Sequence, residues 1–305
     1  MNNKLATIIL VLVTAAWGSS FILMKNVAAD VSALAFLTLR FGMAGLILAA
    51  VFWKKLRDFN KKTILHSFVL GALLCGYMVL QVFGLRFTSA SNSGFITSTS
   101  VLMVPFLSAW FLKKKASKSN LIGVALAVIG LLFITGVLHD FTALNKGDFC
   151  TFLCAICVAI HIIAADLYVK EDDGLLLGIG QTLAAAVLSL GAWFFTEPKV
   201  FFSVDYTPTL ITSVLLTAVF CTAFAFTCQV AMQKYVAPSR VAVIFTLEPV
   251  FAYMYALVIP GPGGLTEPLT LFKVVGSILI VGGTIISEIG LAEKLFSKRE
   301  KTLQA

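Results

Sequence analysis

Apolar residues dominate this chain in long runs that short polar segments separate. The runs are about 20 residues long, and a helix of that length rises roughly 30 Å, the thickness of the hydrocarbon core of a membrane. The pattern therefore predicts an all-α integral membrane protein. Ten transmembrane helices are expected, near residues 6–25, 34–53, 65–85, 93–112, 119–138, 149–168, 175–195, 209–231, 240–259 and 270–289.

The composition supports this prediction. Of the 305 residues, 59% are hydrophobic and 12% are charged, whereas a soluble domain has roughly 25% charged residues. The apolar run that follows Lys4 continues to Met24 with no small-residue cleavage site. It is therefore expected to be the first span and not a signal peptide.

The basic residues predict the orientation in the membrane. Most of them lie in clusters between the apolar runs, such as Lys54–Lys62, Lys113–Lys118 and Lys294–Lys301. With ten spans these clusters fall on one side, which the positive-inside rule assigns to the cytoplasm. We expect a multi-pass protein of the bacterial cytoplasmic (inner) membrane, surrounded by lipid, with both termini cytoplasmic. The net charge of +8 has this simpler explanation, so no nucleic-acid partner is expected. The oligomeric state, monomer or homodimer, stays open.

The sequence predicts no cofactor and no metal. The loops are short and contain no P-loop sequence, so the chain alone is not expected to use ATP. Cys150, Cys154, Cys157 and His161 share one face of a predicted helix. They extend over roughly 16 Å of helix axis, too far for one ion with ligand bonds of roughly 2.0 to 2.3 Å.

The two halves of the chain resemble each other. The segment Phe87–Ser91, before the fourth span, matches Tyr235–Ser239, before the ninth, at an offset of 148 residues. Gly123 and Gly130 recur as Gly276 and Gly283, and Arg40 falls opposite Gln181. Because each half has five spans, the second half must enter the membrane from the opposite side. We therefore expect two inverted five-helix repeats, residues 1–145 and 146–292, followed by a cytoplasmic basic tail, residues 293–305.

Several short motifs resemble the EamA-type branch of the drug/metabolite transporter superfamily, in their order along nearly the whole chain. They are Ala16–Phe21 with Lys25, Leu39–Phe41, Thr88–Asn92, Pro238–Arg240, Leu247–Phe251 and the glycines of the fifth and tenth spans. The resemblance implies ten helices, a central cavity between the halves and movement of metabolites without ATP. Two departures stand out. Val101 falls opposite Pro249, and Cys157–Ala159 replaces a Trp-Ala pair that is common in the family.

Two charged residues lie within predicted spans. Glu248 is about ten residues into its span, roughly 15 Å deep, where an ionised carboxylate needs a partner, water or a proton. It is a candidate for proton coupling or substrate binding, or it is a structural group that satisfies N–H groups loosened by Pro249. Arg40 is a candidate ion-pair partner of Glu248, or it extends outward to anchor its helix.

Other residues are candidates for the wall of a cavity. Pro105 and Pro249 lie in the same member of each repeat and are candidate helix breaks; a packing kink is the alternative. The candidate substrate-binding residues, each of which could instead be an interhelical contact, are Trp17, Tyr77, Gln81, Asn92, His161, Gln181 and Tyr253. Their uncharged donors, acceptors and rings suit a small amphipathic or zwitterionic solute.

These observations lead to a functional hypothesis with one alternative. We predict a secondary transporter that works by alternating access and exports amino acids or related metabolites, with protons as the candidate coupling ion. The alternative is a membrane-embedded enzyme acting on a lipid or isoprenoid. No paired carboxylates or metal constellation near an interface supports an enzyme, so no catalytic residue is assigned.

Overall fold

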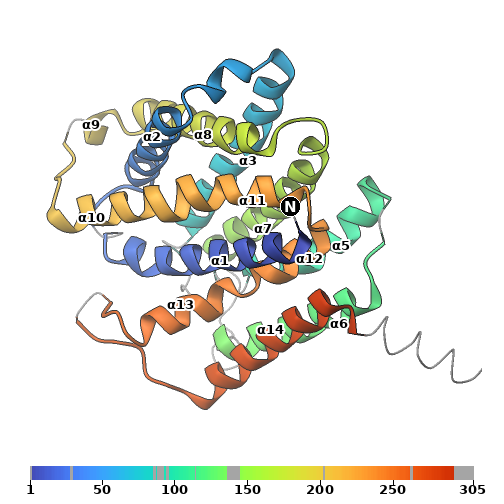
Figure 1. Cartoon of the computed structure of the whole chain (residues 1–305). Coiled ribbons are helices and arrows are strands. Elements are labelled where there is room, and N and C mark those ends of the chain that lie inside the picture. Colours follow the sequence, from blue (N-terminus) through green and yellow to red (C-terminus); the bar gives the residue numbers. More distant parts are fainter. Residues whose placement is uncertain are drawn as a thin grey trace, which may run out of the picture.

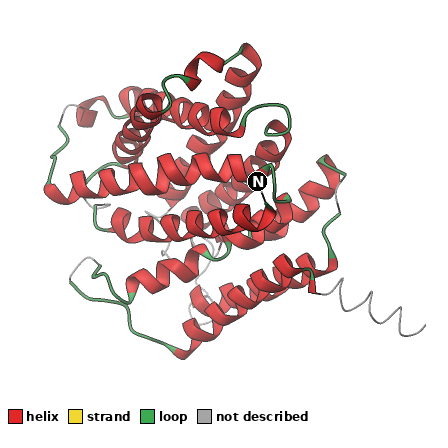
Figure 2. Ribbon diagram, viewed as in Figure 1, coloured by secondary structure: helices red, strands yellow, loops and turns green. Residues whose placement is uncertain are grey.

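The computed structural model describes residues 2–27, 30–84, 87, 93, 96–113, 115–135, 145–201, 203–261 and 264–291. Within these ranges every regular element is a helix and no strand occurs (Figure 2). In chain order the elements are α1 (Asn3–Lys25), α2 (Ala33–Val51), η1 (Lys55–Asp58), α3 (Lys61–Gly84), α5 (Ser100–Phe111), α6 (Lys118–Thr135), α7 (Lys146–Tyr168), α8 (Gly174–Thr196), α9 (Pro198–Phe201), α10 (Pro208–Leu216), η2 (Thr217–Phe224), α11 (Ala225–Gln233), α12 (Pro238–Phe245), α13 (Glu248–Ala256) and α14 (Leu271–Ile289).

Seven helices in the described part of the chain are long and apolar enough to cross a membrane. They are α1, α2, α3, α7, α8, the continuous rod α10–η2–α11, and α14. Two shorter apolar helices cover residues 96–111 and 118–134, and α12 and α13 follow each other across a two-residue break. Each lies on a predicted span. The predicted candidate residue Asn92 and the predicted tail, residues 293–305, lie outside the described residues.

The helices pack around α1, which runs between α11 and α13 (Figure 1). A second group is formed by α3, which packs against α7 and α8, and by α2, which packs against α8. The pair α6 and α14 lies at the edge of the molecule and packs closely along its length. Large apolar side chains such as Phe106, Trp110 and Phe195 are exposed, as expected for a surface that faces lipid.

The rod α10–η2–α11 contains a π-helical segment in its middle. In η2 the N–H of Ala225 bonds to the carbonyl of Phe220, five residues back. The hydroxyl of Thr222 likewise donates to the carbonyl of Thr217 at 2.9 Å. Segments of this kind are rare and often mark functional sites, because they redirect backbone carbonyls and side chains.

An ion-pair cluster joins two distant segments at one end of the bundle. The Nζ of Lys55 lies 2.8 Å from Oδ2 of Asp173, and the Nζ of Lys62 lies 2.8 Å from Oε2 of Glu171. Lys55 and Lys62 lie after α2, whereas Glu171 and Asp173 lie between α7 and α8. We call these four residues the ion-pair cluster.

Asp172 adds a buried contact to the same end. Its carboxylate accepts a hydrogen bond from the Thr63 hydroxyl at 2.6 Å and lies 2.5 Å from Nδ1 of His66. The His66 ring stacks on Tyr168, with 4.0 Å between ring centroids. This end of the bundle is therefore held by polar side chains.

Candidate functional site

A cavity lies among the helices, with walls from both halves of the chain. The empty space inside and in front of it is about 870 Å³, part of which is open to solvent. The lining residues are Trp17, Ser20, Phe21, Met24, Arg40, Tyr77, Met78, Gln81, Thr97, Ser98, Ser100, Val158, His161, Ile162, Phe226, Gln229, Ala242, Phe245, Thr246 and Glu248.

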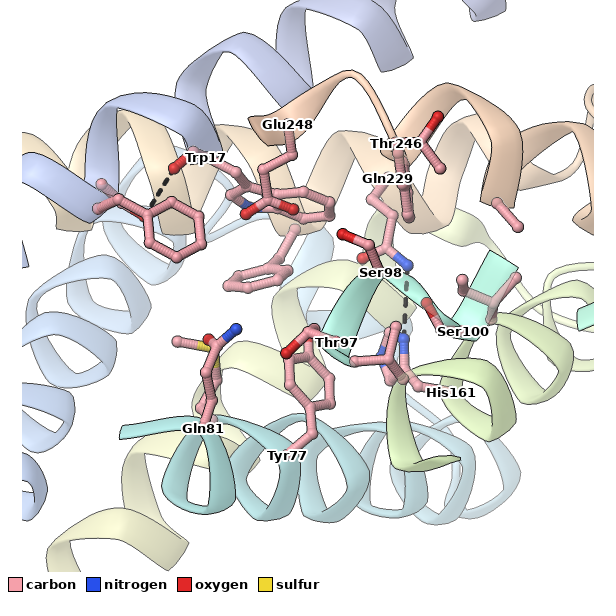
Figure 3. A pocket seen from close by; sticks show the side chains of 18 of the residues that line it. Trp17, Tyr77, Gln81, Thr97, Ser98, Ser100, His161, Gln229, Thr246 and Glu248 are labelled. Carbon is pink, nitrogen blue, oxygen red and sulfur yellow. Dashed lines mark hydrogen bonds between the residues drawn. The ribbon is translucent and has the colours of Figure 1, made fainter. Parts of the chain in front are cut away.

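Polar groups line opposite sides of this space. Tyr77 and Gln81, one turn apart on α3, point into it from one side, and Glu248 points into it from the other (Figure 3). No described residue donates a hydrogen bond to the Glu248 carboxylate or forms an ion pair with it. In this arrangement the carboxylate accepts from no backbone N–H group of the described residues.

Glu248 begins a helix where the predicted ninth span is interrupted. α12 ends at Phe245, and α13 begins at Glu248 with Pro249 in its first turn. The N–H of Leu247 bonds to the carbonyl of Ile244 at 3.0 Å, a tighter three-residue spacing. The break thus places a carboxylate at the start of a helix inside the bundle, where the helix dipole favours negative charge.

Arg40 is buried, with 1% of its surface exposed, and its guanidinium faces η2. It donates from Nε to the hydroxyl of Thr222 at 2.6 Å and from Nη2 to the carbonyl of Cys221 at 3.1 Å. Its Cζ lies 5.9 Å from the centroid of the Phe226 ring. The prediction that the side chain extends outward is wrong. Its hydrogen bonds go to η2 and not to Glu248, and a role as a charged partner of Glu248 stays a prediction.

An aromatic wall surrounds the cavity near Arg40. The ring of Trp17 packs against Phe226 and Phe245, with centroid distances of 5.1 and 4.9 Å. Its Nε1 donates to the carbonyl of Cys221 at 3.1 Å, the same carbonyl that Arg40 binds. The π-helical segment therefore fixes both side chains at one point of the wall.

Comparison with known proteins identifies the chain. The model of the EamA-like transporter family matches residues 4–136 and again residues 145–288. The chain belongs to the EamA-like transporter family. As a family member with several long apolar helices, it is a multi-pass membrane transporter, and its cargo is a small molecule.

Several relatives of this EamA-like chain are named uncharacterized transporters. An uncharacterized transporter of Archaeoglobus fulgidus is 33% identical over 278 residues, which cover 91% of this chain and 83% of that protein. The uncharacterized transporter YoaV of Bacillus subtilis is 23% identical over 90% of this chain and 94% of its own length. The Salmonella typhimurium protein PagO is 24% identical over 83% of this chain and 84% of its own.

The fold of the EamA-like chain has been observed before. One solved structure, described only as the crystal structure of a protein, matches with a TM-score of 0.78. The match covers 96% of this chain and 99% of the other at 18% sequence identity. At this identity the likeness shows the fold alone.

Four predicted substrate-binding residues line the cavity of this EamA-like transporter. Trp17 comes from α1, Tyr77 and Gln81 from α3, and His161 from α7. The ring of His161 meets that of Tyr77 edge-on, with 5.7 Å between centroids. Their roles in binding stay predictions.

Two other predicted binding residues do not line the cavity. Gln181 is fully buried behind it, where its side chain contacts His161 and Phe226. The hydroxyl of Tyr253 donates to the carbonyl of Pro268 at 3.2 Å and accepts from the N–H of Thr270 at 3.1 Å. Both side chains fasten parts of the protein to each other, as polar residues in membrane helices often do.

Pro105 and Pro249 are placed differently. Pro249 directly follows the break between α12 and α13, whereas Pro105 lies inside the continuous helix α5. The tightening in that region comes earlier, at Thr99, whose N–H bonds to the carbonyl of Ile96 at 3.1 Å. Proline removes one helical hydrogen bond but does not fix where the helix breaks.

Sequence reasoning missed the small hydroxyl residues of the cavity. Ser98 and Ser100 line it from one half, and Thr246 lines it from the other. The repeat offset of 148 residues pairs Ser98 with Thr246 and Ser100 with Glu248. Applying that offset to Glu248 would therefore have pointed to Ser100.

Proposed function

We propose that this transporter is a secondary carrier that moves small organic metabolites, such as amino acids and related compounds, by alternating access. Its ten spans form two inverted repeats around the cavity. The main evidence for this proposal is that two glycines on α6 pack reciprocally against two glycines on α14.

This packing is symmetric in a specific way. A Cβ built on Gly123 would lie 2.7 Å from the carbonyl oxygen of Gly283, and one built on Gly130 would lie 2.6 Å from that of Gly276. In the repeat alignment Gly123 corresponds to Gly276, and Gly130 corresponds to Gly283. Gly123 thus contacts the counterpart of Gly130, and Gly130 contacts the counterpart of Gly123. A twofold axis between two helices produces this contact pattern.

Other helix contacts follow the same correspondence. α1 packs against α13 as α7 packs against α5, and α3 packs against α7 as α11 packs against α1. α3 also packs against α8 as η2 packs against α2. A chain whose halves make equivalent contacts has two packings of similar energy, one open to each side of the membrane. This property supports alternating access.

A hydroxyl contact accompanies the tightened turn in each half, at positions one residue apart in the repeat alignment. The hydroxyl of Thr99 donates to the carbonyl of Ile96 at 2.5 Å, and that of Thr246 donates to the carbonyl of Val243 at 2.6 Å. Each stabilises the tightened turn in its own half. We expect both halves to supply an interrupted helix to the cavity, as carriers of this architecture require.

We propose that Glu248 couples transport to protons. A carboxylate without a partner inside the bundle is costly when ionised, so proton binding lowers the cost of passing between the two open states. We also propose a cytoplasmic membrane location with both termini inside, supported by the basic clusters between spans.

Counterflow in vesicles made from the purified protein tests the proposal. Vesicles loaded with an unlabelled mixture of amino acids and related metabolites should accumulate external labelled solute with saturable kinetics. Whatever exchange the Glu248→Gln variant retains should not depend on pH. Single-channel current in planar bilayers, or flux that does not saturate, would contradict a carrier.

A further inference from the structure

A chain of amide side chains behind the cavity fixes the orientation of Gln229. The Nε2 of Gln233 donates to the carbonyl of Ile162 at 2.8 Å, so the Oε1 of Gln233 must face the other way. There it accepts a hydrogen bond from Nε2 of Gln229 at 3.0 Å. Because Gln233 presents an acceptor, the nitrogen of Gln229 must face it, and the Oε1 of Gln229 points away.

A second chain of contacts fixes His161. The Nε2 of Gln181 donates to the carbonyl of Phe226 at 3.1 Å, which leaves its Oε1 to accept from Nε2 of His161 at 2.9 Å. A neutral imidazole with its proton on Nε2 has an acceptor at Nδ1. This Nδ1 lies 3.4 Å from Nε2 of Gln229 (Figure 3). His161 therefore has no proton to give to the Oε1 of Gln229.

The Oε1 of Gln229 is consequently an acceptor without a donor. Gln229 is 1% exposed and lines the cavity, and its Oε1 has no hydrogen-bond partner among the described residues. Buried acceptors are nearly always paired. Among the described buried side-chain atoms without a partner, only Gln229 Oε1 and Thr97 Oγ1 belong to residues that line the cavity.

Glu248 is a further acceptor of the cavity. The Glu248 carboxylate lines the same space as the Gln229 amide (Figure 3), with no described donor. The buried cation, Arg40, instead donates to Thr222 and Cys221 in the wall. Gln229 and Glu248 thus need N–H donors, and Glu248 also favours positive charge, whereas Tyr77 and Gln81 supply donors on the side of the cavity opposite Glu248.

We infer that the cavity binds the ammonium group of an organic amine, with N–H groups donating to Oε1 of Gln229 and to the Glu248 carboxylate. This inference rests on the proposed carrier function. Trp17, Tyr77 and Phe245 surround the space with rings, which suit both an apolar body and a nearby cation. A carboxylate on the cargo is not required.

Three probes of one skeleton test this inference. Phenethylamine carries only the ammonium group, 3-phenylpropanoate carries only the carboxylate, and phenylalanine carries both. Equilibrium dialysis of each labelled probe against the purified protein measures its affinity. We expect phenethylamine and phenylalanine to bind and 3-phenylpropanoate to bind at least tenfold more weakly. Equal binding of the acid, or no binding of the amine at millimolar concentration, overturns the inference.

Two variants of one residue separate the acceptor from the rest of the amide. Gln229→Leu and Gln229→Glu both remove the Nε2 contacts to Gln233 and His161, but only Gln229→Glu keeps an oxygen acceptor. We expect Gln229→Leu to weaken phenethylamine binding about tenfold or more and Gln229→Glu to keep it. Equal loss in both variants would assign Gln229 a structural role only.

The same probes distinguish failure of this inference from failure of the proposed function. If vesicles show saturable exchange of 3-phenylpropanoate but not of phenethylamine, the carrier function is supported and the amine site is contradicted. If amines bind in dialysis but no solute exchanges, the carrier function is contradicted and the amine site is supported.

Discussion

Arg40 donates a hydrogen bond to the main-chain carbonyl of Cys221, at a point where the backbone is π-helical. In an α-helix the N–H of Ala225 would bond to this carbonyl, but here it bonds to Phe220. The Cys221 carbonyl instead accepts from both Arg40 and Trp17. The charge of Arg40 and the π-helical segment therefore stabilise each other.

This relationship predicts the effect of a conservative change. Arg40→Lys keeps the charge but loses the planar fork that reaches Thr222 and Cys221 together. We expect the free energy of unfolding in detergent to fall by about 1.5 to 3 kcal/mol, the range for hydrogen bonds to charged groups. The exposed Arg57→Lys serves as control and should change it little. Equal melting temperatures for both variants would contradict this role of Arg40.

Adjacent glycines on α14 provide a matched test of the α6 contact. A Cβ at Gly283 would lie 2.7 Å from the carbonyl oxygen of Gly123, whereas a Cβ at Gly282 meets nothing within 4 Å. Gly283→Ala should lower the free energy of unfolding by about 1 to 3 kcal/mol through overpacking. Gly282→Ala should be neutral or slightly stabilising. Similar thermal shifts for both would show that the helices do not approach this closely.

Gly18 is predicted to position Glu248. A Cβ at Gly18 would lie 2.7 Å from Cβ of Phe251 and 3.1 Å from the carbonyl oxygen of Glu248. Gly18→Ala should therefore push α13 from α1 and slow counterflow about tenfold, the factor that corresponds to roughly 1.4 kcal/mol. Gly42→Ala, with open space around its Cβ, should leave counterflow unchanged. Normal exchange by Gly18→Ala would remove this contact from the transport cycle.

Much of the fold could be predicted from the sequence because hydrocarbon permits few backbone structures. The expected span at 175–195 corresponds to α8 (Gly174–Thr196), and that at 209–231 corresponds to the rod from Pro208 to Gln233. The π-helical segment could not be predicted, because Thr217–Phe224 has the same apolar composition as its flanks. Its stability comes from tertiary contacts with Arg40 and Trp17.

The cavity was less predictable than the spans. Gln81 and Gln181 were both predicted to bind substrate because their side chains are polar, but only Gln81 lines the cavity. Which face of a helix meets the cavity depends on the rotation of that helix against its neighbours, and mostly apolar helices carry little signal for it. A serine such as Ser100 is not recognisable as a cavity residue from its residue type, although the repeat offset from Glu248 points to its position.

The ion-pair cluster should respond to pH. Burial raises the pKa of Asp173, but hydrogen bonds from Lys55 and the N–H of Leu175 outweigh it and hold the pKa below the ordinary 3.8. A hydrogen bond from Lys62 lowers the pKa of Glu171 below 4.5, and the hydrogen bond to Asp173 raises the pKa of Lys55 above 10.5. Because the two carboxylates have lowered pKa values, they stabilise the fold at a pH above their ordinary pKa values. This stabilisation is lost as the pH falls through the lowered pKa values. Lys55, with its raised pKa, stabilises the fold at a pH below 10.5. This stabilisation is lost as the pH rises through the raised pKa.

Comparison with Asp173→Asn across pH measures this contribution. The asparagine keeps the cap on α8, where Oδ1 of Asp173 accepts from the N–H of Leu175 at 2.8 Å, but loses the charge. The melting temperature should exceed that of the variant between about pH 5 and 10, and the difference should decrease as the pH falls below 3.8 and shrink in high salt. The exposed Asp205→Asn is the control. A difference that does not decrease as the pH falls below 3.8 would rule out the ion pairs as its source.

Two loops test the inversion of the repeats most directly. Asp30 lies between α1 and α2, and Glu171 lies between α7 and α8, the corresponding connection of the second half. Single cysteines at these positions, in a chain whose own cysteines are replaced, can be labelled in intact cells with a membrane-impermeant maleimide. Inverted repeats predict that one position is labelled and the other only after the membrane is opened. Labelling of both from the same side would contradict inverted repeats around a shared cavity.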